Sequence, residues 1–257
     1  MSIRPKKSLG QHFLADQNII EKIVSSVHAA EESRIIEIGA GTGALTGALL
    51  ERFKDVQAVE IDRRAVEALR QRYPDLTIHH QNVLDINWQE LSKGRSLTHV
   101  VGNLPYYITS QILFALLEAR EVLADAILMM QKEVAVRLTA ETRTKEYGIL
   151  SVQTQLMSRP EILFPVSRHC FNPPPKVESA VVYLQFDKRK LSCSDAHLKT
   201  VVRMAFNQRR KKLRNALKPL LGKDLPAGFD FDKRAEAWPP STYEKLTAHL
   251  EQGGILT

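Results

Sequence analysis

The sequence of 257 residues is poor in cysteine and has no long apolar run, and both absences narrow what the protein can be. Cys170 and Cys193 are its only cysteines, and no cluster of further Cys or His residues accompanies them. Two isolated thiols form neither a disulfide framework nor a zinc site, so we expect reduced cysteines, no metal and a cytoplasmic location. No apolar stretch approaches the roughly 20 residues of a membrane span, and the basic N-terminus lacks the apolar core of a secretory signal.

The composition is that of an ordinary globular protein, with 44% hydrophobic and 25% charged residues and no internal repeat. Its length suits one large domain or a large domain followed by a small one. Nothing in the pattern indicates an obligate oligomer, so we expect a monomer.

Positive charge is concentrated in one part of the chain. Residues 188–218 contain eleven Lys and Arg residues and a single acid, Asp195, whereas the rest of the chain is slightly acidic. A helix is predicted over residues 197–217, with five basic residues on its exposed side: Arg209, Arg210, Lys211, Lys212 and Arg214. Such a concentration predicts a nucleic-acid contact. The alternative is a solvated helix face, although such faces usually mix charges of both signs.

Apolar strands alternate with amphipathic helices through most of the sequence, which predicts an α/β fold with a mainly parallel sheet. The predicted strands are residues 34–38, 56–62, 77–81, 98–101, 125–131 and 178–186. After residue 187 the pattern becomes purely helical. We therefore predict a catalytic domain over residues 1–187, with a flexible basic arm at 1–9, and a small all-α domain over 188–257.

A glycine-rich turn, Gly39-Ala40-Gly41-Thr42-Gly43, follows the first predicted strand and leads into a helix. Its glycines let the backbone approach a ligand, as in dinucleotide-binding folds. Glu60 ends the next strand about 20 residues later, where a carboxylate can accept hydrogen bonds from a ribose. Asp85 follows the third strand and could accept the exocyclic amine of adenine, or could simply form a turn. These three sites in series predict an adenosine-bearing cofactor.

The tetrapeptide Asn103-Leu104-Pro105-Tyr106 follows the fourth strand, at the edge where open α/β sheets bind their ligands. Hydrogen-bond acceptors next to an aromatic ring can hold the amino group of a planar base. The alternative is a strand end closed by a proline turn.

Two further stretches frame this site in the sequence. Gln11-His12-Phe13-Leu14 precedes the first helix. Taken by itself, this stretch is interpreted as a hydrophobic staple that seats the helix. Phe171 precedes three consecutive prolines that stiffen its loop, so it could stand out as a second aromatic plate or could belong to the local core.

These stretches occur together, in order, over residues 10–182. The combination resembles the ribosomal RNA adenine N6,N6-dimethyltransferase family, and within it the small-subunit branch. The resemblance implies a Rossmann-like seven-stranded methyltransferase sheet whose last strand is reversed. It implies that S-adenosylmethionine is bound by His12, Leu14, Gly39, Gly41, Glu60, Asp85 and Asn103. It implies a catalytic site formed by Asn103, Leu104, Pro105, Tyr106 and Phe171, with Tyr106 and Phe171 sandwiching the base. Position 12 is often Asn in the family, which makes the His12 contact the least secure of these.

The implied reaction is methyl transfer to N6 of two adjacent adenosines in the 3′-terminal hairpin of small-subunit rRNA, within a pre-ribosomal particle. A large-subunit methyltransferase of the macrolide-resistance type is the alternative in the same class, but Leu104 and Thr42 stand where such enzymes more often have Ile and Lys. A ribosome-assembly factor, with methylation secondary, would also use the basic segment. A nicotinamide-dependent dehydrogenase would explain only the glycines and Glu60.

Overall fold

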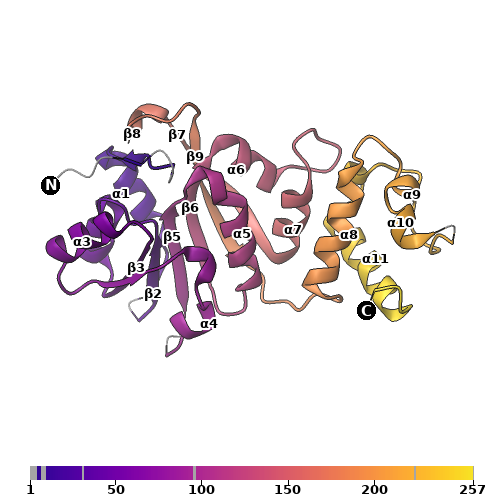
Figure 1. The fold of residues 1–257 in the computed structure, drawn as a ribbon, viewed down its shortest axis with the longest axis horizontal. Coiled ribbons are helices and arrows are strands. Elements are labelled where there is room, and N and C mark those ends of the chain that lie inside the picture. The colour runs from indigo at the N-terminus through magenta and orange to yellow at the C-terminus, as the bar shows by residue number, and fades with distance from the viewer. Residues whose placement is uncertain (1–4, 7–9, 31, 95–96, 223, 257) are drawn as a thin grey trace. The chain divides into compact units, whose positions relative to one another are not determined.

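The computed structural model describes residues 5–6, 10–30, 32–94, 97–222 and 224–256. The chain forms two compact units (Figure 1). The first contains residues up to 135 together with 160–186, and the second contains 136–159 together with 187–257. Residues 136–159 thus group with the C-terminal helical stretch and not with the sheet. Most of the arm expected at 1–9 lies outside the described residues.

The first unit is built on a seven-stranded sheet with the strand order β4-β3-β2-β5-β6-β9-β7. Neighbouring strands from β4 to β6 pair in parallel, and β9 pairs antiparallel with β6. The strands are β2 (Arg34–Ile38), β3 (Asp55–Glu60), β4 (Thr77–His80), β5 (Thr98–Asn103), β6 (Asp125–Gln131), β7 (Ser158–Val166) and β9 (Ser179–Phe186). This arrangement confirms the predicted α/β methyltransferase fold and its reversed last strand.

Amphipathic helices cover this sheet. They are α1 (Gln17–Ser25), α2 (Ala44–Arg52), α3 (Arg63–Arg72), α4 (Trp88–Leu91) and α5 (Thr109–Glu118), while α6 (Lys132–Thr139) crosses the division between the units. Helix α5 buries Ile112, Leu113, Leu116 and Leu117, the three- and four-residue spacing of a single helix face. Asp16 caps α1 and Asp62 caps α3, each accepting a hydrogen bond from a backbone N–H of the first turn.

The strand order reverses between β2 and β5, which brings two strand ends together at the carboxyl edge of the sheet. Ile38 and Gly102 are register partners there, so Gly39 and Asn103 follow side by side. A Cβ atom at Gly102 would lie 2.6 Å from the carbonyl oxygen of Ile38, so only glycine fits at this position. Ligands of open α/β sheets bind at such a reversal.

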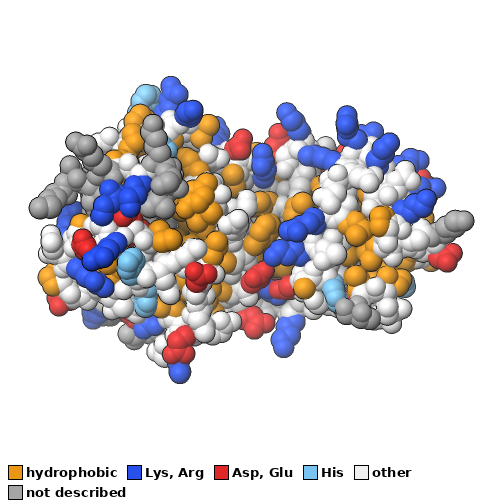
Figure 2. All heavy atoms as spheres, in the orientation of Figure 1, with side chains coloured by type: hydrophobic (Ala, Val, Ile, Leu, Met, Phe, Trp, Pro, Cys, Tyr) orange, Lys and Arg blue, Asp and Glu red, His pale blue; other side chains and the backbone are white. Residues whose placement is uncertain are grey.

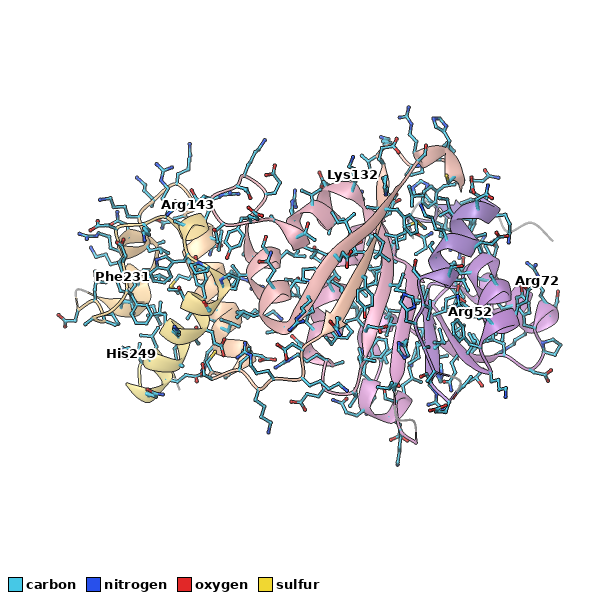
Figure 3. All side chains as sticks on the ribbon, turned by 180° about the vertical axis from the view of Figure 1, so that it is seen from behind. Arg52, Arg72, Lys132, Arg143, Phe231 and His249 are labelled. Atoms are coloured by element: carbon cyan, nitrogen blue, oxygen red, sulfur yellow. The ribbon has the colours of Figure 1, made fainter. Side chains whose placement is uncertain are left out.

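The second unit is helical and has an aromatic core. Its main helices are α7 (Ile149–Met157), α8 (Asp195–Asn207) and α11 (Pro240–Gln252), with the short helices α9 (Leu213–Ala216) and α10 (Lys218–Leu221). The rings of Trp238 and Tyr243 meet at 5.5 Å, and Phe231 packs on Trp238 at 5.4 Å. Phe231 and His249 of this unit are labelled in Figure 3. The buried hydroxyl of Tyr147 donates to the Trp238 carbonyl at 2.9 Å, which ties the 136–159 stretch to the C-terminal stretch.

The helix predicted over residues 197–217 is interrupted, which corrects the expectation. Helix α8 ends at Asn207, residues 208–212 form a turn, and α9 begins at Leu213. The backbone N–H groups of Leu213 and Arg214 donate to Lys233 and Phe231, contacts that draw the chain away from the axis of α8. Four of the five basic residues therefore lie in a turn and only Arg214 lies in a helix.

Candidate active site

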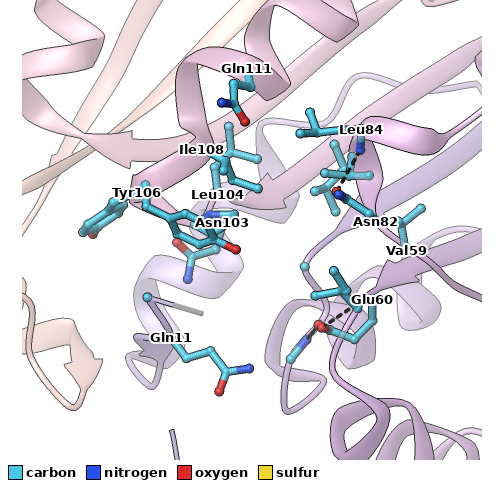
Figure 4. Close-up of a pocket in the computed structure, with 18 of the residues that line it drawn as sticks. Gln11, Val59, Glu60, Asn82, Leu84, Asn103, Leu104, Tyr106, Ile108 and Gln111 are labelled. Atoms are coloured by element: carbon cyan, nitrogen blue, oxygen red, sulfur yellow. Dashed lines mark hydrogen bonds between the residues drawn. The ribbon is translucent and has the colours of Figure 1, made fainter. Parts of the chain in front are cut away.

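A cavity of about 280 Å³ opens at the carboxyl edge of β2, β3 and β5 (Figure 4). Its size suits a small-molecule site. Five stretches of the first unit line it: residues 10–13, the turn after β2, the end of β3, residues 81–84, and residues 103–108 with Gln111. The glycine turn, Glu60, the Gln11–Phe13 stretch and the tetrapeptide thus meet at one place.

The glycine-rich turn after β2 presents backbone to this cavity. Gly39, Gly41 and Gly43 all have left-handed φ angles, of 71°, 54° and 81°. A Cβ atom at Gly41 would lie 3.1 Å from the ring of Phe13, so a side chain would crowd the cavity wall. Gly39 and Gly41 line the cavity as predicted.

Glu60 is held by three backbone N–H groups at the opposite side of this turn. One carboxylate oxygen accepts from Gly41, and the other accepts from Ile61 and Asp62, each at 2.8 Å (Figure 4). A carboxylate offers about four lone-pair sites, so Glu60 keeps acceptor capacity for a ligand hydroxyl. This is the geometry expected of a ribose-binding carboxylate on the strand next to the glycine turn.

Glu37 lies behind Glu60 and is buried in β2. Burial raises the pKa of its carboxyl to about 7, with a smaller contribution in the same direction from the charge of Glu60. The hydroxyl of Thr46 donates to Glu37 at 2.5 Å and partly opposes the rise. Glu37 and Glu60 are therefore two carboxyl groups in different environments, one buried in β2 and one at the cavity wall.

Asn103 occupies the end of β5 and lines the cavity. Its side-chain amide donates to the backbone carbonyl of His12 at 3.0 Å. That contact fixes the amide plane and leaves the side-chain oxygen available as an acceptor. The carbonyl of Pro105 already accepts from the N–H of Ile108 and the hydroxyl of Thr109, at 3.2 and 3.1 Å.

Tyr106 provides a fixed aromatic ring beside these acceptors. Its hydroxyl shares a hydrogen bond of 2.6 Å with Ser179, and burial raises the pKa of the phenol, so the ring stays neutral at physiological pH. The imidazole of His12 is stacked at 5.8 Å from the Tyr106 ring and is held by the carbonyl of Pro173 at 2.8 Å. Leu104, Pro105 and Tyr106 all line the cavity, as does His12.

Three predicted site residues lie elsewhere. Leu14 and Phe171 are 5% and 4% exposed and are paired across two short strands, β1 (Phe13–Leu14) and β8 (Phe171–Asn172), with their side chains in the hydrophobic core. The structure therefore corrects the expectation of Phe171 as a second plate, because strand pairing draws its ring into the core. Asp85 is exposed at the end of a 3-10 turn, Val83–Asp85, and does not line the cavity.

Asn82 takes the place on the cavity wall that was expected for Asp85. Its side-chain oxygen accepts from the N–H of Leu84 at 3.1 Å (Figure 4). Asn82 could have been predicted from its position, because it follows the strand end closely whereas Asp85 comes three residues later. Tyr107, Gln111 and Ile61 were also missed, although the second tyrosine of a Tyr-Tyr pair beside the tetrapeptide was a usable sign.

The basic residues of the second unit differ in their contacts. Arg209 donates to the carbonyl of Thr144 at 2.9 Å and lies near Glu236, while Lys212 and Arg214 both bind Asp232, at 2.9 and 2.5 Å. Arg210 and Lys211 are exposed, and within the described residues the side chain of neither has a hydrogen bond or an ion pair. Lys and Arg side chains gather over this unit in Figure 2.

Within the described parts of the chain, no three His, Cys, Asp or Glu residues are grouped so that they could hold a metal ion. A search of the same residues finds no helix with the length and apolarity needed to cross a membrane.

The chain is similar to known proteins over nearly its whole length. A family model described as ribosomal RNA adenine dimethylase matches residues 3–233. The chain is 48% identical to the ribosomal RNA small subunit methyltransferase A of Salinibacter ruber, with 96% of this chain and 86% of that protein covered. It is 42% identical to the protein of the same name from Bacteroides thetaiotaomicron, covering 97% and 95%.

Two solved structures resemble the chain over nearly its whole length. A dimethyladenosine transferase from Plasmodium falciparum has a TM-score of 0.81 at 26% identity and covers 95% of this chain and 99% of its own. The 23S rRNA methyltransferase ErmE has a TM-score of 0.68, also at 26% identity, and covers 93% and 100%.

Proposed function

This chain belongs to the ribosomal RNA adenine dimethylase family, and we propose that it transfers methyl groups from S-adenosylmethionine to N6 of two adjacent adenosines in the 3′-terminal hairpin of small-subunit rRNA. The single observation that carries this proposal is that Asn103 and Tyr106 line the same cavity as the glycine turn and Glu60. Hydrogen-bond acceptors for an amino group and an aromatic ring thus share one cavity with the glycine turn and Glu60, which suit a nucleoside cofactor.

The residues of this wall fit S-adenosylmethionine. The remaining acceptor capacity of Glu60 suits ribose hydroxyls, and Gly39 and Gly41, which have no side chains, let a ligand approach the backbone at the cavity wall. Asn82 and Leu84 line the end of the cavity beyond Glu60, where an adenine ring would lie. When bound, S-adenosylmethionine supplies an electrophilic methyl group on a sulfonium.

The acceptors at the catalytic side act on the amino group of the target adenine. Its lone pair is conjugated with the ring and is therefore a weak nucleophile. The Asn103 side-chain oxygen and the Leu104 carbonyl would accept its two hydrogens, which favours a pyramidal nitrogen. Among the described residues the Leu104 carbonyl has no hydrogen bond, whereas the Pro105 carbonyl already has two. No strong base is needed, because positioning provides most of the acceleration.

Tyr106 would hold the extruded base by stacking. A base stacked on an aromatic side chain gains about 1–3 kcal/mol, which offsets part of the cost of leaving its neighbours. The hydroxyl contact with Ser179 keeps the ring in one orientation for both methyl additions.

The small-subunit substrate is supported by the relatives that carry that name and by the higher TM-score of the dimethyladenosine transferase, 0.81 against 0.68 for the 23S enzyme. Leu104 and Thr42 support the same choice. Among the described residues of the basic turn, Arg210 and Lys211 have exposed side chains that could meet the phosphate backbone of an RNA within a pre-ribosomal particle. We propose that the protein acts there as a monomer.

The test is methyl transfer from labelled S-adenosylmethionine to isolated small and large ribosomal subunits that lack these modifications, followed by mass analysis of the nucleosides. We expect N6,N6-dimethyladenosine in the small-subunit RNA alone. Product in the large-subunit RNA would assign the macrolide-resistance type of activity instead. Tight particle binding without product on either subunit would favour an assembly factor.

A further inference from the structure

Residues 10–13 form one wall of the cavity and are held at two ends by different contacts. Gly10, Gln11, His12 and Phe13 all line the cavity. The end near Phe13 is fixed by the β1–β8 pairing, by the His12 contact with Pro173 and by the His12 contact with Asn103. The other end, at Gly10 and Gln11, has no strand partner among the described residues, and its backbone has one long hydrogen bond, from the Gln11 N–H to the Lys6 carbonyl at 3.4 Å, beside its side-chain contacts.

Asp62 supplies the main contact at that free end. The Gln11 side-chain amide donates to one Asp62 carboxylate oxygen at 3.1 Å, and the Gln11 side-chain oxygen accepts from the Lys6 N–H at 2.8 Å. The Asp62 side chain is fully buried, although Asp62 itself does not line the cavity. A carboxylate without solvent exposure makes a strong and specific anchor for an amide donor.

Asp62 also contacts Glu60 through its own backbone. Its N–H donates to Glu60 at 2.8 Å, so one residue orients the ribose-binding carboxylate and anchors the 10–13 segment. The Arg64 guanidinium holds the pKa of the Asp62 carboxyl far below its usual range, so the anchor keeps its charge at any physiological pH. Capping of α3 needs only one of the two carboxylate oxygens.

Gly10 lies against the ring of Tyr107, on the opposite side of the cavity from Asp62. A Cβ atom at Gly10 would lie 3.2 Å from the ring of Tyr107, and the φ of 56° at Gly10 is one that side chains rarely allow. The segment therefore bridges the cavity, from Asp62 after β3 to Tyr107 after β5. A bridge of this kind covers a bound ligand from the side that the sheet leaves open.

We propose that Asp62 is a positioning residue for S-adenosylmethionine, acting through Gln11 to hold residues 10–13 across the cofactor. This inference rests on the proposed function. It goes beyond the capping role of Asp62, because a cap alone would not require the Gln11 contact. Since the Phe13 end is fixed independently, loss of the anchor weakens cofactor binding more than it disturbs Asn103.

The test uses the full-length protein with two variants and a matched control. Asp62→Ser keeps a residue that caps helices well but removes the carboxylate from Gln11. Gln11→Ala removes the other partner and leaves the α3 cap in place. Asp16→Ser makes the same change at the cap of α1, which has no contact with Gln11. Calorimetric titration with S-adenosylmethionine and with S-adenosylhomocysteine gives the dissociation constants without any RNA.

We expect both variants to raise the two dissociation constants about tenfold, the usual worth of a hydrogen bond to a charged group. The double variant should lose no more than either single variant, and Asp16→Ser should bind as the wild type does. In steady-state assays Asp62→Ser should raise the KM for S-adenosylmethionine about tenfold, with kcat within about threefold of the wild type.

Unchanged affinity in both variants, or losses that multiply in the double variant, would overturn the inference. If Asp62→Ser does not fold, Asp62→Thr, another residue that caps helices, takes its place in every comparison. A folded wild-type protein that binds neither ligand would instead refute the proposed cofactor.

Discussion

The side-chain amide of Asn103 donates to the backbone carbonyl of His12 at 3.0 Å, a contact between residues 91 positions apart in the chain. It joins the end of β5 to the segment before α1 and orients the one side chain on which the proposed chemistry most depends. The same contact explains why a carboxamide suits this position, since it donates to the protein and still accepts from the substrate.

Replacing Asn103 with Ala should reduce methyl transfer at least 100-fold, because both the amide acceptor and its fixed geometry are lost. RNA affinity should change little, since the basic turn lies in the other unit. Single-turnover methylation and filter binding of the RNA measure the two effects. Asn215→Ala, at an exposed position in α9, is the control. Activity within tenfold of the wild type would remove Asn103 from its role.

Arg210 and Lys211 should carry most of the electrostatic RNA binding of the basic turn. Replacing both with Ala should lower the slope of log affinity against log salt by about one to two, because each phosphate contact contributes about 0.7–0.9. Lys212→Ala should have less effect, since that side chain already binds Asp232. Lys245→Ala on α11 is an exposed control. An equal change of slope in all of these variants would argue for nonspecific attraction.

Arg209 should behave differently from its neighbours in the turn, because its guanidinium is tied to Thr144 and lies near Glu236. Charge reversal there should lower the urea midpoint of unfolding as well as RNA affinity. If Arg209→Glu changes only the salt slope, its side chain leaves these contacts to meet the RNA.

Phe171→Ala should destabilise the protein by about 3–5 kcal/mol, as expected for a large side chain removed from a core. Urea unfolding measures this loss. Phe171→Leu keeps most of the apolar volume and should retain both stability and turnover. A stable Phe171→Leu protein with greatly reduced turnover would show that the ring reaches the base, and would restore its role as a second aromatic plate.

Glu37 should make the protein less stable as pH rises. Burial raises the pKa of this carboxyl to about 7 in the folded state, above its unfolded value, so the folded state holds the proton longer. The free energy of unfolding should therefore fall between about pH 4.5 and 7, by about 3 kcal/mol from this group, and then level off. Glu37→Gln should remove that part of the slope, as urea unfolding at pH 5 and pH 7.5 would reveal. An unaltered slope would assign the titration to another group.

The regular part of the fold could be predicted from the sequence because each element carries a local signal. The alternation of buried strands and amphipathic helices marked β2 to β6, and the glycine turn and Glu60 were recognisable by position. Asn103 and Tyr106 were likewise marked by standing at a strand end.

The remaining errors arose where contacts distant in sequence decide the structure. Phe171 is drawn inward by pairing with Leu14, which no local pattern records. The helix expected at 197–217 breaks because the chain near Leu213 bonds to residues around Phe231. The anchor between Gln11 and Asp62 joins two stretches 51 residues apart, so neither residue indicates the other.

The division of the second unit into residues 136–159 and 187–257 sets an order on its synthesis. Helix α7, with six buried residues, is made before α8 and α11, against which it packs. All strands of the sheet have been made once Phe186 has been added, but α7 must wait for the last helix. At ordinary elongation rates this interval is on the order of ten seconds. During it the nascent chain carries a helix whose buried face is still uncovered, while every strand of the sheet has already been made.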